Sequence, residues 1–385
     1  MDRRQFIAAG CLAAASPLLA QAATPGAAAY DAASLFKRVN FQSDGLALNP
    51  HEYISVLGEV AAGQDLKPGC YSNDGIVAQL EQHFAKLLGK EAAMFVPTGT
   101  LANHLAIRKL AGNDHRVLVQ AESHFYNDCG DCAEILSGLN LIPLGAGRST
   151  IDLAEVKSWV ERSAGGRVES KVGVISIESP VRRRDHEFVD FAELERISHY
   201  AREQGIRLHL DGARMFNLPL HTGKSISDYA GLFDTVLVSL WKHFNGASGA
   251  MLAGSADFIK GLFHTRRMFG GSLPQAWPSV AVVSRYVDSY ADDYAKSWQA
   301  ADQLIALLRA DGRFKVDKVV NGTSRFFITA PGITPELLTE RLAKRGVDIG
   351  HPKPGTNLIA MQVNPSLLRE RPARLARLFS DALSS

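Results

Sequence analysis

The sequence predicts an α/β fold with a mostly parallel, seven-stranded sheet in a large domain and a small α/β domain at the C-terminus. Three observations support this prediction. Short, nearly continuous apolar runs alternate with segments whose apolar residues recur at helical spacing. Strands that are apolar on both faces are typical of parallel sheets covered by helices on both sides. Glycine, aspartate and lysine residues follow the ends of three of these runs, which is where parallel sheets bind ligands.

Apolar runs predict the strands of the large sheet at residues 94–96, 116–120, 139–143, 172–177, 207–210, 235–238 and 249–253. Helical segments separate most of them. One has apolar residues at helical spacing between Gly75 and Leu88, and others are predicted at Thr100–Leu110 and Phe191–Gln204. Strand and helix therefore alternate through the large domain, as a parallel sheet requires.

A long amphipathic stretch from about Ala281 to Ala310 is predicted to be a helix that bridges to the small domain. Beyond it, the pattern predicts a strand, a helix, a strand and a helix at Arg325–Thr329, Pro335–Arg345, Leu358–Val363 and Pro372–Leu383. We therefore expect a signal peptide, an N-terminal arm, a large domain, and a bridging helix with the small domain at residues 1–22, 23–45, 46–285 and 286–385.

The N-terminus resembles a twin-arginine export signal. Asp2-Arg-Arg-Gln-Phe-Ile7 precedes an apolar stretch of roughly a dozen residues, which is too short to span a membrane, and Ala20-Gln-Ala22 fits a cleavage site. We therefore expect the twin-arginine translocase to export the chain to the periplasm, with cleavage near Ala22 and no membrane segment in the mature form. The alternatives are an uncleaved anchor and a chance pair of arginines.

The overall composition is that of an ordinary globular protein. Hydrophobic residues make up 46% of the chain and charged residues 21%. The formal net charge is +2, and we find no motif for nucleic-acid recognition. Composition and charge therefore give no reason to expect a nucleic-acid partner.

Lys242 directly follows the apolar run Thr235–Trp241 and precedes a turn of small residues. A lysine at the mouth of a buried strand is partly desolvated, which lowers its pKa and frees the amine for Schiff-base chemistry. A single lysine at a strand end is more often a surface residue that extends its amine into solvent. Two further strand ends argue against that simpler interpretation.

The first of these is the turn at Gly99 and Thr100, which opens a helix. Glycine lets the backbone approach a phosphate, and the N-terminus of the helix attracts anions. The second is Asp211, which could face a pyridine nitrogen and keep it protonated. Taken singly, the two are an ordinary turn and a helix-capping aspartate. Phosphate cradle, acid and then lysine is the order expected of a fold-type I pyridoxal 5′-phosphate (PLP) enzyme.

His124 and Arg214 are further candidates. His124 follows the strand that ends near Gln120 and could stack over a flat cofactor ring and relay protons. Arg214 could pair with the phenolic oxygen of the cofactor or with a substrate carboxylate. The alternatives are a core histidine and a solvated helix charge.

From about Phe41 onward the chain resembles the threonine aldolase and β-eliminating lyase family, whose members have the fold-type I PLP-dependent transferase fold. The resemblance is strongest at Phe95–Asn103, His209–Arg214 and Ser239–Lys242. It implies that residues 46–285 bind PLP and that the protein is a homodimer or homotetramer with sites between subunits. No metal is implied.

The resemblance also implies residue roles. Lys242 would carry PLP, Asp211 would bind the ring nitrogen, Gly99 and Thr100 would bind the phosphate, and His124 would stack on the ring. Lys242, His124 and Asp211 are thus the expected catalytic residues. Cofactor or substrate contacts are implied for Arg214, Ser43, Tyr71 and Arg267.

The chain departs from the family pattern at several positions. Trp241 adds bulk beside Lys242, and Pro274 replaces a phosphate-binding arginine, for which we expect Arg267 to compensate. Cys129 stands where glutamate is usual. The C-terminal arginine that binds the substrate carboxylate has no counterpart in residues 357–362. This loss weakens the case for a free α-carboxylate on the substrate.

Two features keep alternatives open. Arg182–Arg184 replaces a glycine turn and could bind a carboxylate or a larger anionic substrate, or simply form a solvated loop. Cys129 and Cys132 could form a disulfide in an oxidising compartment or stay unpaired. We find no further cysteine or histidine at a spacing that suits zinc.

The expected function is a PLP-dependent lyase, like low-specificity L-threonine aldolase, that cleaves the Cα–Cβ bond of a β-hydroxy amino acid into glycine and an aldehyde. A base would take the β-hydroxyl proton. The first alternative is another PLP reaction on a periplasmic amino-acid-derived substrate: transamination, racemisation, β-elimination or tailoring of an amino-acyl group. A lesser alternative is a non-catalytic binding protein. Twin-arginine export carries folded proteins, which suits a cofactor loaded in the cytoplasm.

Overall fold

The structure, a computed structural model, describes residues 34–63 and 65–384. The chain divides into two units, Met1–Leu35 and Phe36–Ser385, and all elements discussed here belong to the second. The predicted signal peptide, residues 1–22, and residues 23–33 of the predicted arm lie outside the described residues. Among the described helices, none is both long and apolar enough to cross a bilayer.

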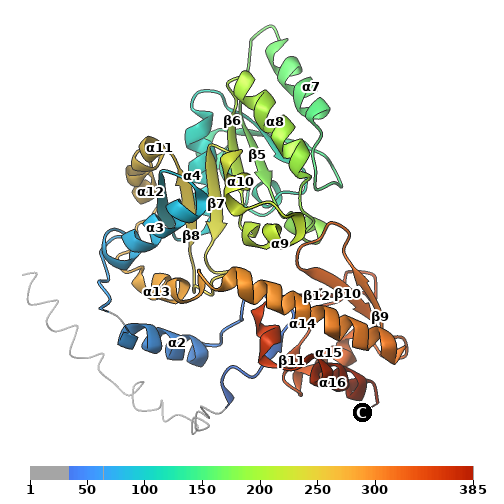
Figure 1. Cartoon of the computed structure of the whole chain (residues 1–385). Coiled ribbons are helices and arrows are strands. Elements are labelled where there is room, and N and C mark those ends of the chain that lie inside the picture. The colour runs from blue at the N-terminus through green and yellow to red at the C-terminus, as the bar shows by residue number, and fades with distance from the viewer. Residues whose placement is uncertain (1–33, 64, 385) are drawn as a thin grey trace, which may run out of the picture. The chain divides into compact units, whose positions relative to one another are not determined.

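A seven-stranded sheet forms the centre of the second unit (Figure 1). In spatial order its strands are β2 (Ala92–Val96), β8 (Ala250–Gly254), β7 (Thr235–Ser239), β6 (Arg207–Asp211), β5 (Val172–Glu178), β3 (Arg116–Gln120) and β4 (Asn140–Leu144). β8 runs opposite to the other six strands, which are parallel to one another. The predicted α/β fold with a mostly parallel sheet of seven strands is therefore confirmed.

Helices cover both faces of this sheet. Along β7, Val236 and Val238 belong to one apolar cluster while Leu237 belongs to another, as expected when alternate side chains point to opposite faces. The first cluster includes residues of α3 (Gly75–Leu88), α8 (Phe191–Glu203), α10 (Ile226–Gly231) and α13 (Trp277–Tyr286). The other face packs against α4 (Gly99–Ala111), α5 (His124–Asn127) and α6 (Cys132–Ser137).

The C-terminal part of this unit, where the small domain is predicted, contains a separate antiparallel sheet of three strands, which accompanies the long helix α14 (Tyr290–Asp311) (Figure 1). Its strands are β12 (Ile359–Gln362), β10 (Arg325–Thr329) and β9 (Lys315–Lys318), and its helices are α15 (Pro335–Ala343) and α16 (Pro372–Ser384). A two-residue strand of the arm, β1 (Val39–Asn40), pairs with β11 (Val347–Asp348). The arm is thereby attached to the small domain. The predicted boundary between the large and small domains, at residues 285 and 286, remains a prediction.

The remaining described elements connect these layers. They are α2 (Pro50–Gly63), α7 (Leu153–Ala164), α9 (Leu218–Thr222), α11 (Ala256–Lys260), α12 (Phe263–Met268) and the short 3-10 turns η2 (Arg182–Arg184), η3 (Met215–Asn217) and η4 (Pro365–Arg369).

One predicted helix was wrong in its extent. The stretch expected as a single bridging helix from about Ala281 to Ala310 consists of α13 and α14, separated by Val287–Ser289. Apolar side chains continue at helical spacing on both sides of the break, with Val283, Val287 and Tyr290 all buried. The periodic pattern therefore concealed the break between the two helices.

Candidate active site

A cavity of about 190 Å³ lies at the carboxyl ends of β6 and β7. It brings together Gly99 and Thr100 at the start of α4, His124 at the start of α5, Asp211 at the end of β6, and Lys242 beyond β7. These five residues were predicted from separate motifs. Their convergence on one cavity is what makes this the candidate active site.

The start of α4 forms one end of the cavity. Thr98 caps the helix, and its side chain accepts a hydrogen bond of 3.2 Å from the amide of Leu101. The first amides of a helix have no intrahelical acceptor and can bind an anion. A methyl group at Gly99 would meet nothing closer than Leu237, at 3.9 Å. Packing within the chain therefore does not require glycine here, whereas a ligand at the helix terminus would.

Ser239 gives a second sign that the cavity suits a polar group. Its hydroxyl oxygen is buried, lines the cavity, and has no hydrogen-bond partner. Buried polar atoms usually have a partner, so an atom without one at a cavity wall indicates a position for a ligand. Ser239 was not predicted as a site residue. The available signals were its place as the last residue of a buried strand and as the first residue of the family-like segment Ser239–Lys242.

Asp211 is held by a network that runs behind it. Its carboxylate accepts hydrogen bonds from Asn103 Nδ2 at 2.6 Å and from the amide of Ala213 at 3.1 Å. Asn103 Oδ1 lies 2.8 Å from His209 Nε2, and His209 Nδ1 lies 2.8 Å from the hydroxyl of Thr235. Burial lowers the pKa of His209 to about 4, so this imidazole is neutral near pH 7. The network therefore holds the Asp211 carboxylate in one orientation at the cavity wall.

Lys242 sits in the connection between β7 and β8. Hydrogen bonds close this connection at its base, from Leu240 N to Gly249 O at 3.0 Å and from Gly246 N to Leu240 O at 3.2 Å. Burial, and then the nearby Arg214 guanidinium, lower the pKa of Lys242 to about 8. The amine is thus more readily neutral than an ordinary lysine, as the sequence suggested.

A second cavity of about 250 Å³ shares Trp241 and Lys242 with the first. Ser43 lines it, so the structure places this predicted substrate contact beside Lys242. Trp241 lines both cavities and is also 53% exposed to solvent.

Arg214 is buried, and the Asp44 carboxylate binds one edge of its guanidinium group through two hydrogen bonds. Its Nε and Nη2 atoms each lie 2.8 Å from a carboxylate oxygen of Asp44, which also accepts from Gln362 Nε2 at 3.1 Å. Burial alone would raise the pKa of Asp44, but Arg214 outweighs it and holds that pKa well below its usual range. The predicted contact of Arg214 with cofactor or substrate stays a prediction, and Asp44 is a partner that sequence reasoning missed.

Glu178 is another residue that was missed. This buried carboxylate ends β5 and lies next to Asp211 in the register of the sheet. It accepts hydrogen bonds from the amide of His124 at 2.6 Å and from the amide of Arg182 at 2.9 Å. Burial, and then the Asp211 charge, raise the pKa of Glu178. Its position after the predicted strand 172–177 was the available signal.

The arginine cluster at Arg182–Arg184 is paired with protein carboxylates. Arg182 and Arg183 both bind Asp128, and Arg184 lies 3.4 Å from Glu187. Asp128 Oδ2 in turn lies 3.3 Å from His124 Nδ1. The cluster is therefore joined to the site through one acidic residue.

Tyr71 and Arg267 lie together but line neither cavity. The Arg267 guanidinium carbon is 4.8 Å from the centre of the Tyr71 ring, and both residues are exposed. The structure therefore does not bring these two predicted contacts to Lys242 of the same chain.

Cys129 and Cys132 are free thiols in the structure. Cys129 Sγ lies 3.9 Å from the Thr100 hydroxyl and 3.6 Å from the carbonyl of His124. Within residues 34–63 and 65–384, no three histidine, cysteine or acidic side chains gather as metal ligands would.

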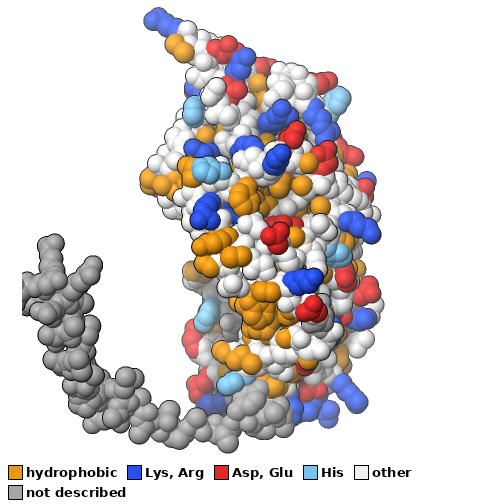
Figure 2. Space-filling view, turned by 90° about the vertical axis from the view of Figure 1, so that its left-hand side faces the viewer, with side chains coloured by type: hydrophobic (Ala, Val, Ile, Leu, Met, Phe, Trp, Pro, Cys, Tyr) orange, Lys and Arg blue, Asp and Glu red, His pale blue; other side chains and the backbone are white. Residues whose placement is uncertain are grey.

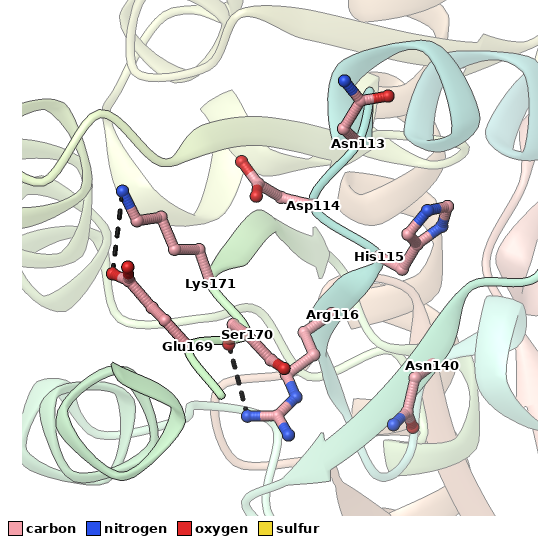
Figure 3. A pocket seen from close by; sticks show the side chains of 8 residues that line it. All are labelled: Asn113, Asp114, His115, Arg116, Asn140, Glu169, Ser170 and Lys171. Carbon is pink, nitrogen blue, oxygen red and sulfur yellow. Dashed lines mark hydrogen bonds and ion pairs between the residues drawn. The ribbon is translucent and has the colours of Figure 1, made fainter. Parts of the chain in front are cut away.

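A larger pocket, of about 580 Å³, lies at the opposite end of the sheet (Figure 3). It surrounds the amino ends of β3, β4 and β5, where Arg116 Nη1 donates to the carbonyl of Ser170 at 3.3 Å and Lys171 lies 3.6 Å from Glu169. Parallel sheets bind ligands at their carboxyl ends, and this pocket contains none of the predicted site residues. Size alone therefore does not identify the site.

The chain is similar to known proteins in sequence and in structure. The family described as β-eliminating lyase matches residues 41–329. The low-specificity L-threonine aldolase of Eremothecium gossypii is 32% identical over 239 residues, covering 62% of this chain and 61% of that protein. Alanine racemase TOXG of Cochliobolus carbonum is 28% identical over 239 residues, covering 62% of this chain and 60% of the racemase. The chain thus spans about three fifths of the length of these relatives.

Solved structures share the fold over a greater length. A protein of Listeria monocytogenes EGD-E, provisionally named L-allo-threonine aldolase, is 27% identical and has a TM-score of 0.74. The match covers 90% of this chain and 96% of that protein.

Proposed function

Because the chain belongs to the β-eliminating lyase family, we propose that it is a PLP-dependent lyase that cleaves the Cα–Cβ bond of a β-hydroxy amino acid to glycine and an aldehyde. PLP is the cofactor that the family and the fold imply. The observation that carries the proposal is the single cavity that unites Lys242, Asp211, His124 and the start of α4. The names of the threonine aldolase relatives support the substrate class.

The residues of the cavity fit this cofactor. Lys242 would attach it, Asp211 would bind the ring nitrogen, and the amides at Gly99 and Thr100 would bind the phosphate. Ser239, whose buried hydroxyl lacks a partner, would also face the cofactor. When bound, PLP withdraws electrons from the substrate Cα.

The remaining chemistry would belong to side chains that line or lie near the two cavities that share Lys242. His124 would lie over the cofactor ring, and its Nε2 would accept the β-hydroxyl proton. Ser43 would donate a hydrogen bond to the substrate carboxylate. Arg214 would contact cofactor or substrate through Nη1, since Asp44 binds its Nε and Nη2 atoms. Lys242, with its lowered pKa, would be neutral above about pH 8.

The decisive experiment incubates the purified, PLP-loaded protein with L-threonine and L-allo-threonine. We expect acetaldehyde and glycine in equal amounts from at least one of them, and none with Lys242→Ala. Lys260→Ala, an exposed lysine of α11, is the matched control and should retain activity. A loaded wild-type protein that releases no aldehyde from either amino acid would contradict the proposal.

A second candidate is racemisation, which the similarity to an alanine racemase favours. This reaction exchanges the α-proton without breaking the Cα–Cβ bond. Incubation with L-alanine in D₂O would show deuterium at Cα and formation of D-alanine. These products without any acetaldehyde from threonine would replace the first proposal.

We also propose that the protein is a homodimer or homotetramer in which Tyr71 and Arg267 reach the site of a neighbouring subunit. Both are exposed and line neither cavity of their own chain. The side that carries α2, α3 and α12 exposes apolar side chains between charged ones (Figure 2). Ile54, Phe263 and Met268 of α2 and α12 are among the exposed large apolar residues.

Subunit mixing tests this arrangement. Lys242→Ala and Arg267→Ala should each be nearly inactive alone, but mixed oligomers should regain activity because one site receives both native residues. Light scattering gives the oligomer size. A fully active monomer would contradict the arrangement.

Export through the twin-arginine translocase to the periplasm, with PLP loaded beforehand, is a further proposal, supported by Arg3 and Arg4 and the apolar stretch after them. Replacing both arginines with lysine should leave the uncleaved protein in the cytoplasm. If the wild type and the variant with two lysines gave equal amounts of mature periplasmic protein, that result would contradict this route.

A further inference from the structure

Asp128 has no part in the function proposed above, yet it lies against one of its residues. Its Oδ2 atom is 3.3 Å from Nδ1 of His124, one helical turn earlier in the chain. The other ring nitrogen of His124, Nε2, lies 3.5 Å from the Thr100 hydroxyl at the cavity wall. The imidazole therefore has a carboxylate on one side and the cavity on the other.

Two arginines fix Asp128. Arg183 Nη2 lies 2.7 Å from Oδ1, and Arg182 Nη2 hydrogen-bonds to Oδ2. Only about a fifth of the Asp128 side chain is exposed, against about two fifths of each arginine side chain. A carboxylate that accepts from two guanidinium groups stays ionised and keeps one orientation.

The backbones of the two partners are tied to the same buried group. The amide of His124 donates to Glu178 Oε2 at 2.6 Å, and the amide of Arg182 donates to Glu178 Oε1 at 2.9 Å. The histidine and the arginine turn are thus held at a constant separation. Asp128 joins the same two segments through their side chains, while Glu178 joins them through their backbone amides.

We propose that Asp128, held by Arg182 and Arg183, is a positioning residue that keeps the hydrogen of the neutral His124 ring on Nδ1 and leaves Nε2 as the acceptor. This inference rests on the proposed role of His124 in accepting a proton. A carboxylate can only accept, so Nδ1 must donate to it, and the opposite nitrogen is then free for the cavity. The arginine cluster accordingly serves the histidine rather than a substrate carboxylate.

The first test observes the ring directly and needs no activity. In PLP-loaded protein labelled with ¹⁵N-histidine, nitrogen–proton correlation spectra distinguish the two tautomers, and loss of signal in His124→Asn assigns the residue. We expect the Nδ1–H form in the wild type. Asp128→Asn should shift the ring toward Nε2–H, because both arginines compete for the one amide oxygen and turn the amide N–H toward Nδ1.

The second test is a double-mutant cycle on kcat. Asp128→Asn should lower kcat by about 10- to 100-fold, the range seen when a carboxylate behind a metal-bound histidine is lost, with little change in KM. In a His124→Phe background the same substitution should have no further effect. A purely structural role would give the same loss in both backgrounds. Asp311→Asn removes another arginine-bound carboxylate, at the end of α14, and should leave kcat unchanged.

Each outcome decides the inference. Unchanged His124 signals in Asp128→Asn, or equal losses of kcat in both backgrounds, would overturn it. If the wild type cleaves no β-hydroxy amino acid, the proposed function fails, while the spectra still decide the role of Asp128. If Asp128→Asn does not fold, Arg183→Gln takes its place and should shift the His124 tautomer in the same direction by a smaller amount. An unchanged tautomer in Arg183→Gln would then overturn the inference.

Discussion

The carboxylate of Asp211 depends on Asn103, a buried amide that was not predicted as a site residue. Asn103→Ala should leave Asp211 Oδ2 and His209 Nε2 without their partners. Because each unpaired buried group is costly, we expect a loss of about 2 kcal/mol in the free energy of unfolding of the apoprotein and weaker binding of PLP. Urea unfolding and cofactor titration measure the two effects.

Asn113→Ala, in the exposed loop before β3, is the control for that substitution and should change the free energy of unfolding by less than about 0.5 kcal/mol. Equal effects of the two alanine variants would show that the network does not support Asp211.

The pKa of Lys242 gives a prediction on pH. A free amine must be neutral to capture the cofactor, and its lowered pKa of about 8 moves the change in protonation into an accessible range. The rate of PLP capture by the apoprotein should rise about tenfold per pH unit below pH 8 and level off above it. Stopped-flow absorbance measures this rate. A rate that keeps rising to about pH 10 would indicate an ordinary lysine.

At the scale of elements, one substitution at the start of α4 should stabilise the apoprotein and weaken its binding of PLP. Gly99→Ala should raise the free energy of unfolding of the apoprotein by up to about 1 kcal/mol, because alanine suits a helix and the new methyl group has room. It should also weaken PLP binding, because that methyl group would take up space that the phosphate would need beside the first amides of α4. Thermal unfolding of the apoprotein measures the change in stability, and titration with PLP measures the change in affinity.

Gly231→Ala, at the end of α10, is the matched control, since a methyl group there meets no atom within 4 Å. It should leave PLP affinity unchanged. If Gly99→Ala destabilised the apoprotein, the glycine would be required by packing and not by a ligand.

The accuracy of the sequence-based elements follows from their burial. The strands of the large sheet were predicted because nearly all their residues are apolar and buried, as in β5 and β7. β9, with the sequence Lys-Val-Asp-Lys, exposes three of its four residues and gave no such signal. β1 and β11 have two residues each and exist only because they pair with one another. Long-range pairing of this kind leaves no local pattern.

At the scale of the whole molecule, Asp44 joins the arm to both sheets. Its carboxylate binds Arg214 after β6 and Gln362 at the end of β12. Removing one partner of a buried ion pair leaves the other unpaired, so Asp44→Asn should lower the free energy of unfolding by about 3–5 kcal/mol at pH 7. The exposed pair of Arg38 and Asp348 is the control, and Asp348→Asn should cost less than about 1 kcal/mol.

The buried pair of Asp44 and Arg214 also predicts how acid changes the stability of the protein. Burial raises the pKa of Asp44, but the attraction of Arg214 lowers that pKa by a larger amount. The folded pKa therefore lies below the unfolded value of about 4. The stabilisation is therefore present above pH 4 and is lost as the pH falls below it. The difference between wild type and Asp44→Asn in urea unfolding should shrink from pH 7 to pH 3. A constant difference would exclude the charge as its origin.

The site was predictable where a residue ends a buried strand or opens a helix. Asp211, Lys242 and Gly99 follow apolar runs, so their convergence could be expected from topology alone. Asp44 and Asp128 lie in segments without periodicity, and their roles come from arginines far along the chain. The sequence showed those arginines as unassigned charges, because partners across such separations are visible only once the chain is folded.

The connection that carries Lys242 behaves as a rigid wall. Its base is closed by hydrogen bonds, and an added Cβ at Gly246 or Gly249 would lie 2.8 Å from Val283 or 2.7 Å from Phe95. Moving this wall outward would break those hydrogen bonds and close contacts. We therefore expect space for a bulky molecule to come from rotation of the half-exposed indole of Trp241. The size of the molecules this scaffold accepts would then change through exchange of that one aromatic side chain, and not through lengthening of the loop.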